Sequence, residues 1–141
     1  MTRTILTVCV SVSFALGLIS AQAADKKEVD LSKFPPALDK TGVTYATDIK
    51  PILEKSCTTC HGAEKHKGRL RLDGLEAVLK GGEDGKVVVP GNSAESMLVH
   101  NIAHAGDPEA YMPPPKNKAN IPPLTKEQIG LIRAWIDQGA K

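Results

Sequence analysis

The sequence predicts a small all-α domain with long loops, on three observations. Four segments carry apolar residues at the three- and four-residue spacings of an amphipathic helix, and helix-capping residues bound them. No segment alternates apolar and polar residues for more than a few positions, so no β-sheet is expected. Six of the ten prolines lie between residues 108 and 123, which predicts a long irregular loop there. The length of 141 residues fits one domain.

Residues 1–23 have the composition of a secretory signal peptide. Arg3 is the only charge before an apolar stretch from Ile5 to Ile19, and Ala21-Gln22-Ala23 has the small-x-small pattern that signal peptidase cuts. About 15 apolar residues fall short of the roughly 18–20 that span a bilayer. We therefore expect cleavage after Ala23 and export to the periplasm, with an uncleaved N-terminal anchor as the alternative. The mature chain contains no second apolar run, so no membrane span is expected in it.

Residues 24–41 are predicted to be a flexible N-terminal arm, and residues 42–141 the folded domain. The arm is charged and is interrupted by Pro35-Pro36, although Phe34 offers a ring that could pack on the domain. The whole chain has 18 Lys and Arg against 16 Asp and Glu, a net charge of +2. This balance predicts neither a nucleic-acid partner nor a strong electrostatic field that would steer a partner.

The first two predicted helices lie in the first half of the domain. One begins at Thr47 or Asp48 and runs to about Ser56, with Pro51 in its first turn, where a missing N–H costs little. The next is short: its N-terminal cap is Asp73, with Glu76 three residues on, and it ends at the glycine pair 81–82.

The third and fourth predicted helices follow the same logic. Asn92 caps the third, which is expected to bury Met97, Leu98 and Ile102. Residues 106–124 then form the proline-rich loop. In the last helix, Thr125 and Gln128 make a capping box, and Gly139 ends it.

The segment Cys57-Thr58-Thr59-Cys60-His61 carries the chemistry of this chain. Cys-x-x-Cys-His is the attachment sequence of a c-type haem. Two thiols three positions apart can add to the two vinyl groups of one porphyrin as thioethers, and the adjacent imidazole then lies under the iron. Attachment of this kind takes place outside the cytoplasm, which agrees with the predicted signal peptide.

Three other interpretations of the two cysteines compete with haem attachment. A thioredoxin-like dithiol needs a strand before the motif and a βαβ frame, and the sequence shows neither. A structural zinc site needs four ligands, of which Cys57, Cys60 and His66 offer three and His100 a distant fourth. A disulfide across two intervening residues would constrain little of the chain.

A haem iron held by His61 has a sixth position, and its occupant decides between electron transfer and ligand chemistry. The candidates are Met112, Met97, His66, His100 and His104. Met112 is favoured because the prolines that follow it hold the backbone extended and stiff. Met97 is expected in the core, His66 in solvent, and His100 with His104 on an exposed helix face.

In the order and spacing of its motifs, the chain resembles the planctomycete-type cytochrome c domain, a short class-I-like module with one haem. The resemblance runs from Tyr45 to Ala140. Arg69 departs from it, because the family more often has a small residue there. The matching motifs are Asp48-Ile49-Lys50-Pro51-Ile52-Leu53, Cys57-x-x-Cys60-His61-Gly62, Gly68-Arg69-Leu70-Arg71-Leu72-Asp73, Gly81-Gly82, Val89-Pro90-Gly91-Asn92, Ser96-x-Leu98, Met112-Pro113-Pro114, Leu124-Thr125 and Leu131-x-x-x-Trp135-Ile136-x-x-Gly139-Ala140.

The resemblance implies a cytochrome c-like helical fold wrapped around one covalent haem c. Cys57 and Cys60 would carry the thioethers, and His61 and Met112 would bind the iron, with Trp135 packed near the haem. We expect a monomeric electron carrier rather than an enzyme, passing single electrons between a periplasmic dehydrogenase and a terminal acceptor. The alternatives are a haem enzyme or gas sensor with an open sixth position, a cytochrome subunit of a larger dehydrogenase complex, and a metal-binding module without haem.

Aromatic residues are scarce, with one Trp, two Tyr and two Phe in the whole chain. A buried porphyrin would supply the large flat apolar body that such a core lacks. The sequence therefore predicts that the protein folds poorly without its cofactor.

Overall fold

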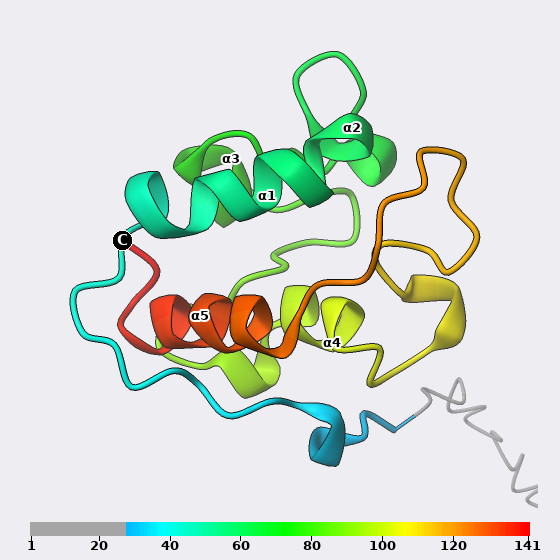
Figure 1. The fold of residues 1–141 in the computed structure, drawn as a ribbon. Coiled ribbons are helices and arrows are strands. Elements are labelled where there is room, and N and C mark those ends of the chain that lie inside the picture. The colour runs from blue at the N-terminus through cyan, green and yellow to red at the C-terminus, as the bar shows by residue number, and fades with distance from the viewer. Residues whose placement is uncertain (1–27) are drawn as a thin grey trace, which may run out of the picture.

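The computed structural model describes residues 28–141, so the predicted signal peptide, residues 1–23, lies outside the described residues. The described part contains helices and no strand (Figure 1), which confirms the all-α prediction for it. The α-helices are α1 (Lys50–Ser56), α2 (Thr58–His61), α3 (Leu75–Lys80), α4 (Met97–Ile102) and α5 (Lys126–Asp137), with a π-helical turn at Tyr45–Ile49 and 3-10 turns at Leu31–Lys33, Lys67–Arg69, Ser93–Glu95 and Pro108–Ala110.

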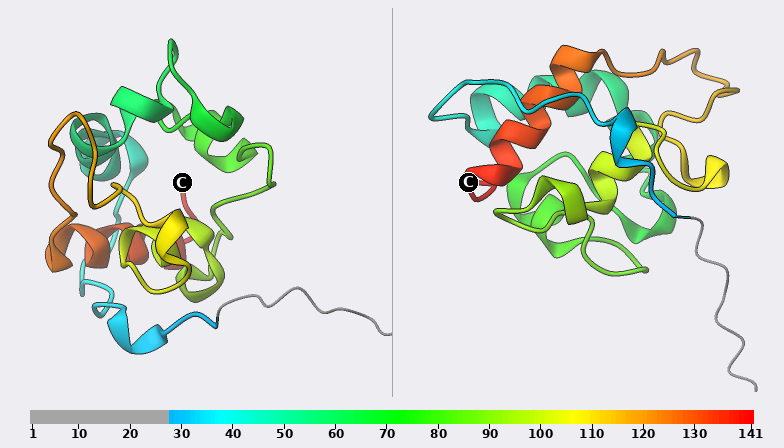
Figure 2. Two further views of the ribbon diagram at one scale, coloured as in Figure 1. Left: turned by 90° about the vertical axis from the view of Figure 1, so that its right-hand side faces the viewer. Right: turned by 90° about the horizontal axis from the view of Figure 1, so that it is seen from below.

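The helices lie in two layers, with α1, α2 and α3 on one side and α4 and α5 on the other (Figures 1 and 2). The end of the chain returns to the start of the first layer, where the backbone N–H of Tyr45 donates to the carbonyl of Lys141 at 3.0 Å. No helix in the described part of the chain combines the length and the apolar character that crossing a membrane requires. The wrapping of this fold around a haem stays a prediction.

The core lies between α1 and α5. The ring centroids of Tyr45 and Trp135 are 6.0 Å apart, and the Trp135 indole N–H donates to the carbonyl of Lys141 at 2.9 Å. Aromatic side chains bury the largest areas in a small core, so this pair joins the two layers. Fully buried aliphatic side chains surround it: Ile49, Leu53, Val78, Val88, Val99, Ile132 and Ile136.

Helix α5 forms as its sequence predicts. The N–H of Gln128 donates to the Thr125 hydroxyl at 3.2 Å, and the Gln128 side-chain oxygen accepts from the Thr125 N–H at 2.9 Å. The capping box is therefore complete. At the other end, Gly139 follows in a left-handed conformation with φ of 99°, which ends the helix as expected.

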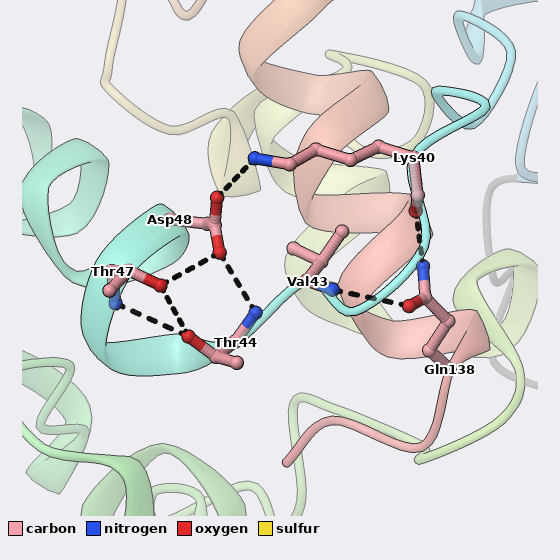
Figure 3. Close-up of polar contacts among 6 residues, drawn as sticks. All are labelled: Lys40, Val43, Thr44, Thr47, Asp48 and Gln138. Atoms are coloured by element: carbon pink, nitrogen blue, oxygen red, sulfur yellow. Dashed lines mark hydrogen bonds and ion pairs between the residues drawn. The ribbon is translucent and has the colours of Figure 1, made fainter.

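The first helical segment begins earlier than its apolar pattern predicts. A π-helical turn from Tyr45 precedes α1, because Thr44 caps the segment: its hydroxyl accepts from the N–H of Thr47 at 3.4 Å (Figure 3). Pro51 lies in the first turn of α1, as predicted. The extra turn brings Tyr45 into the core, where its hydroxyl donates to the carbonyl of Leu72 at 3.0 Å.

Two predicted helix starts are wrong. The N-terminal cap of α3 is Gly74, because the Asp73 carboxylate is paired with the Arg71 guanidinium at 2.7 Å. Asn92 does cap a 3-10 turn, but α4 begins only at Met97. The Met97 side chain then lies at the start of the helix and is 40% exposed, so the expectation that it is buried in the core is also wrong.

The described part of the predicted arm packs on α4 and α5. The Phe34 ring lies under the Arg133 guanidinium, 5.4 Å from ring centroid to Cζ, and its centroid is 5.6 Å from that of His100. The backbone N–H of Leu38 donates to the carbonyl of Gly130 at 3.0 Å. The charged composition of this segment does not predict these contacts, because they are made by a single aromatic ring and by backbone groups.

Candidate cofactor site

A cleft of about 900 Å³ separates the segment around α2 from the loop after Met112. Both segments lie at the right-hand end of the molecule in Figure 1. Trp135, which the sequence places beside the cofactor, belongs to the core and does not line this cleft. The lining residues are Ser56, Cys57, Thr59, Cys60, Glu64, Lys65, His66, Lys67, Met112, Pro113, Pro114, Lys116, Asn117, Lys118, Ala119 and Ile121.

Cys57 and Cys60 lie one helical turn apart on one wall of the cleft. Cys57 ends α1 and begins α2, with its N–H donating to the Leu53 carbonyl at 2.8 Å and its carbonyl accepting from the N–H of Cys60 at 3.1 Å. Both thiols are free, and burial raises the pKa of the Cys57 thiol to about 12. One turn of helix thus presents two free thiols to the same cleft.

His61 follows directly and is half-buried. Its Nδ1 lies 3.3 Å from the carbonyl oxygen of Leu70. Because a carbonyl can only accept, this contact puts the ring proton on Nδ1 and leaves the lone pair on Nε2, the arrangement that a metal-binding histidine needs. Burial lowers the pKa of His61, which further favours the neutral ring.

The turn after His61 depends on a glycine. A Cβ on Gly62 would lie 2.5 Å from the carbonyl oxygen of Thr58, closer than any real side chain approaches. The N–H of Gly62 donates to the Lys65 carbonyl at 2.7 Å, and the N–H of Leu72 donates to the His61 carbonyl at 2.7 Å. The backbone therefore closes tightly behind the two cysteines and the histidine.

Met112 lies on the opposite wall. Its backbone N–H donates to the carbonyl of Asn101 at 3.0 Å, which ties the loop to the last turn of α4. Asn117 braces the rest of the loop: its side-chain N–H groups donate to Pro114 and Ile121 carbonyls, and its oxygen accepts from the N–H of Ile121 at 2.8 Å. The thioether thus approaches the cleft from a loop with fixed backbone contacts.

The structure separates three of the other candidates for a sixth ligand, Met97, His100 and His104, from the cleft. Met97 is exposed on α4. The Nε2 of His100 lies 2.7 Å from the Ala94 carbonyl, and the His104 ring stacks on Tyr111. Neither histidine lines the cleft, and the expectation that both lie on an exposed helix face is not met, since each is partly buried.

His66 is the one other candidate that lines the cleft. Its backbone forms an isolated antiparallel bridge with that of His61. This bridge places the His66 backbone beside that of His61, which does not itself line the cleft. A second iron ligand would have to come from the side of the porphyrin opposite His61. Geometry therefore favours Met112 over His66.

Sequence reasoning missed the charges around the cleft. Lys65 and Lys67 line it on the α2 side, and Lys116 and Lys118 line it on the loop side, against the one acidic residue Glu64. Each lysine is visible in the sequence, but only folding brings the two pairs together. The cleft carries more positive charge than the net +2 of the chain suggests.

These features fit a covalently held haem. Small-molecule and cofactor sites usually enclose about 300–1,000 Å³, and this cleft falls within that range. Two thiols on one turn, an imidazole with its lone pair on Nε2 and a thioether across the cleft are the donors that such a haem uses. Among residues 28–141, no three His, Cys, Asp or Glu side chains are grouped to hold a bare metal ion. Within the same range, no strand frames the dithiol as thioredoxin chemistry would require.

A short helical domain whose cleft is lined by Cys57, Cys60 and Met112, with His61 directly after the second cysteine, has the set of donor residues that a c-type cytochrome uses to hold its haem. The comparison with protein families agrees: residues 57–116 match the family model for planctomycete cytochrome C. The match supports a planctomycete-type cytochrome c domain over this part of the chain. The matched range includes Cys57, Cys60, His61 and Met112. Searches of curated proteins and of solved structures found no match.

Proposed function

We propose that the protein binds one haem c in this cleft and carries single electrons between redox proteins of the periplasm. The observation that supports this most is that Cys57, Cys60 and Met112 line one cleft although about fifty residues of sequence separate the cysteines from the methionine. The family match supports the same class of protein.

Each residue has a distinct task in this proposal. Cys57 and Cys60 would hold the porphyrin edge through thioether bonds, and Nε2 of His61 would bind the iron. Met112 would be the second iron ligand and would keep dioxygen and peroxide from the metal. Bound haem supplies an iron that changes its charge by one electron at a potential that a Met/His pair raises.

The protein's part in electron transfer is to position the group and to shield it from water. A reduced donor protein gives up one electron, an oxidised acceptor takes it, and no bond or proton is exchanged on the way. Periplasmic location rests on residues 1–23 and on the attachment chemistry, and a dehydrogenase and a terminal acceptor are the partner classes that it suggests. A cytochrome subunit of a dehydrogenase complex would use the same residues.

Covalent attachment is tested with the full chain co-expressed with a c-type haem maturation system. We expect a pyridine haemochrome spectrum with the c-type absorption, one haem per chain by mass, and loss of residues 1–23 from the exported protein. A protein without the covalent c-type spectrum would contradict the proposal.

The sixth ligand is tested separately with Met112→Ala, with the exposed Met97→Ala as the matched control. The methionine-to-ferric-iron absorption band should disappear and the reduction potential should fall only in Met112→Ala. Rapid, complete binding of carbon monoxide to the reduced wild-type protein would instead indicate an open sixth position, as in a haem enzyme or gas sensor.

A further inference from the structure

The turn after α4 contains an unusual residue. His104 has a left-handed backbone with φ of 51°, a region that glycine adopts readily and histidine seldom. The turn closes through the N–H of Ala105, which donates to the His100 carbonyl at 3.0 Å. A residue held in a disfavoured conformation suggests that its side chain makes a contact that offsets the cost.

That contact is a face-to-face stack on Tyr111. The ring centroids of His104 and Tyr111 are 4.5 Å apart and the ring planes differ by 2°. The Nε2 atom of His104 is buried and has no hydrogen-bond partner among the described residues. Since hydrogen bonding at Nε2 does not hold the ring, the stack is what orients it.

Tyr111 directly precedes Met112 in the sequence. The last turn of α4, next to His104, also contacts Met112 itself. The carbonyl of Asn101, in the last turn of α4, accepts from the N–H of Met112 at 3.0 Å. The turn is itself anchored, because Nζ of Lys33 donates to the His104 carbonyl at 3.1 Å. Two contacts from one anchored turn thus act on two consecutive residues of the loop.

We propose that His104 is a positioning residue for Met112: by stacking on Tyr111 it fixes the direction in which the Met112 side chain enters the cleft. This inference rests on the proposed role of Met112 as an iron ligand. The hydrogen bond to Asn101 fixes the Met112 backbone at one point, but the loop could still rotate about that hydrogen bond. The stack of His104 on Tyr111 prevents this rotation of the loop. His104 does not touch the cofactor in this scheme and is not a ligand.

The test uses the haem-loaded full chain and three variants. His104→Asn removes the ring but keeps a residue that tolerates a left-handed backbone. His104→Phe restores a flat ring without the buried nitrogen. His100→Ala is the matched control, since His100 lies in α4, just before this turn, and its ring packs on Phe34 rather than on Tyr111. The readouts are the methionine-to-ferric-iron band, followed with temperature alongside far-ultraviolet circular dichroism, and the rate of carbon monoxide binding to the reduced protein.

In His104→Asn we expect the band to be lost well below the temperature of global unfolding, and carbon monoxide to bind about two- to tenfold faster, the factor by which loss of one aromatic pair shifts an opening equilibrium. His104→Phe should restore both readouts toward wild type. In His100→Ala, the methionine-to-ferric-iron band and the far-ultraviolet circular dichroism signal should be lost at the same temperature. His104→Asn with a wild-type band and rate, or His104→Phe that behaves like His104→Asn, would overturn the proposal.

Failure of the underlying function looks different. If wild type itself lacks the methionine band, or keeps it in Met112→Ala, then Met112 is not the ligand and the proposed function fails at that point. If wild type shows the band, Met112→Ala abolishes it and His104→Asn leaves both readouts unchanged, Met112 stands and only the role of His104 is overturned.

Discussion

A carboxylate oxygen of Asp48 accepts a hydrogen bond from the backbone N–H of Thr44 at 2.9 Å, and this contact closes the turn that begins the first helical segment (Figure 3). The same oxygen accepts from the Thr47 hydroxyl at 3.0 Å, and the other oxygen accepts from Nζ of Lys40. The hydrogen bond from Lys40, followed by those from Thr44 and Thr47, lowers the pKa of Asp48 to about 2.

This carboxylate predicts a specific acid sensitivity of the folded domain. The unfolded chain has the ordinary pKa of 3.8 at Asp48, so it binds more protons than the folded chain between pH 4 and pH 2. The contribution of Asp48 is therefore present above pH 4 and is lost as the pH falls toward 2. Asp48→Asn should lower the unfolding temperature at pH 7 and flatten its fall between pH 4 and 2. Asp39→Asn, an exposed neighbour, is the control, and an unchanged pH profile in Asp48→Asn would contradict the assignment.

Local patterns predicted local structure well. The capping box of Thr125 and Gln128 formed as expected because both hydrogen bonds lie within one turn. The start of α3 was mispredicted because Asp73 had two uses, a cap or a partner for Arg71, and the sequence does not rank them. Packing of Phe34 under Arg133 joins segments almost a hundred residues apart, and no local pattern contains it.

The candidate site also has a part that the local sequence predicts and a part that depends on the fold. Cys57, Cys60 and His61 are contiguous, so the motif alone predicts which residues they are, and residues 57–116 match the family model. Met112 was one of five candidates for the sixth ligand, and only the fold, which ties it to Asn101 opposite the cysteines, separates it from the others. Its role as ligand stays a prediction.

Gly62→Ala is expected to damage the cysteine-containing turn. A Cβ there meets the Thr58 carbonyl oxygen at 2.5 Å, and that oxygen belongs to the backbone of α2, which has little room to move. Overpacking of this kind costs about 1–3 kcal/mol, and the displaced turn should also reduce the yield of covalent haem. Gly106→Ala is the control, because its Cβ would make only an ordinary contact, 3.8 Å from Cγ2 of Val29, and it should change stability by about 0.5 kcal/mol or less. Equal haem yield and stability in the two variants would contradict this account.

The lysines around the cleft should speed electron exchange with anions. From the net charge alone no steering field is expected, but Lys65, Lys67, Lys116 and Lys118 converge on one opening. Charges of one sign around a cleft raise the local concentration of an oppositely charged reactant. Oxidation of the reduced protein by ferricyanide, measured by stopped flow at low ionic strength, should therefore slow about two- to tenfold in Lys116→Glu/Lys118→Glu.

Two controls make that experiment specific. Lys80→Glu/Lys86→Glu changes the net charge equally at exposed positions that do not line the cleft, and it should have a clearly smaller effect. The effect of the cleft variant should fade as salt is added and should reverse in sign with a cationic oxidant such as tris(phenanthroline)cobalt(III). Equal slowing by both charge-reversal pairs would show that only net charge matters.

Removing the haem should cost the protein its cooperative fold. A domain of this size is stable by about 5–15 kcal/mol, and a large apolar group that is buried only in the folded state contributes directly to that margin. Without it, the cleft of about 900 Å³ has no apolar filling, and the loop that carries Met112 loses its partner across the gap. Cys57→Ala/Cys60→Ala, and wild type made without the maturation system, should both unfold over a broad range of temperature and bind a dye for exposed apolar surface.

The fluorescence of the single tryptophan can show whether removal of the haem also disrupts the core. Trp135 is fully buried between the two helical layers, away from the cleft, so its fluorescence reports on the core rather than on the site. If the cofactor completes the core, emission from both apoproteins should lie near that of an exposed indole and should change little with denaturant. A sharp unfolding transition with buried-indole emission in wild-type apoprotein would show that α1 and α5 pack without haem, and that the scarcity of aromatic residues does not limit folding. Because that apoprotein keeps both thiols, the Cys-to-Ala substitutions could not explain the result.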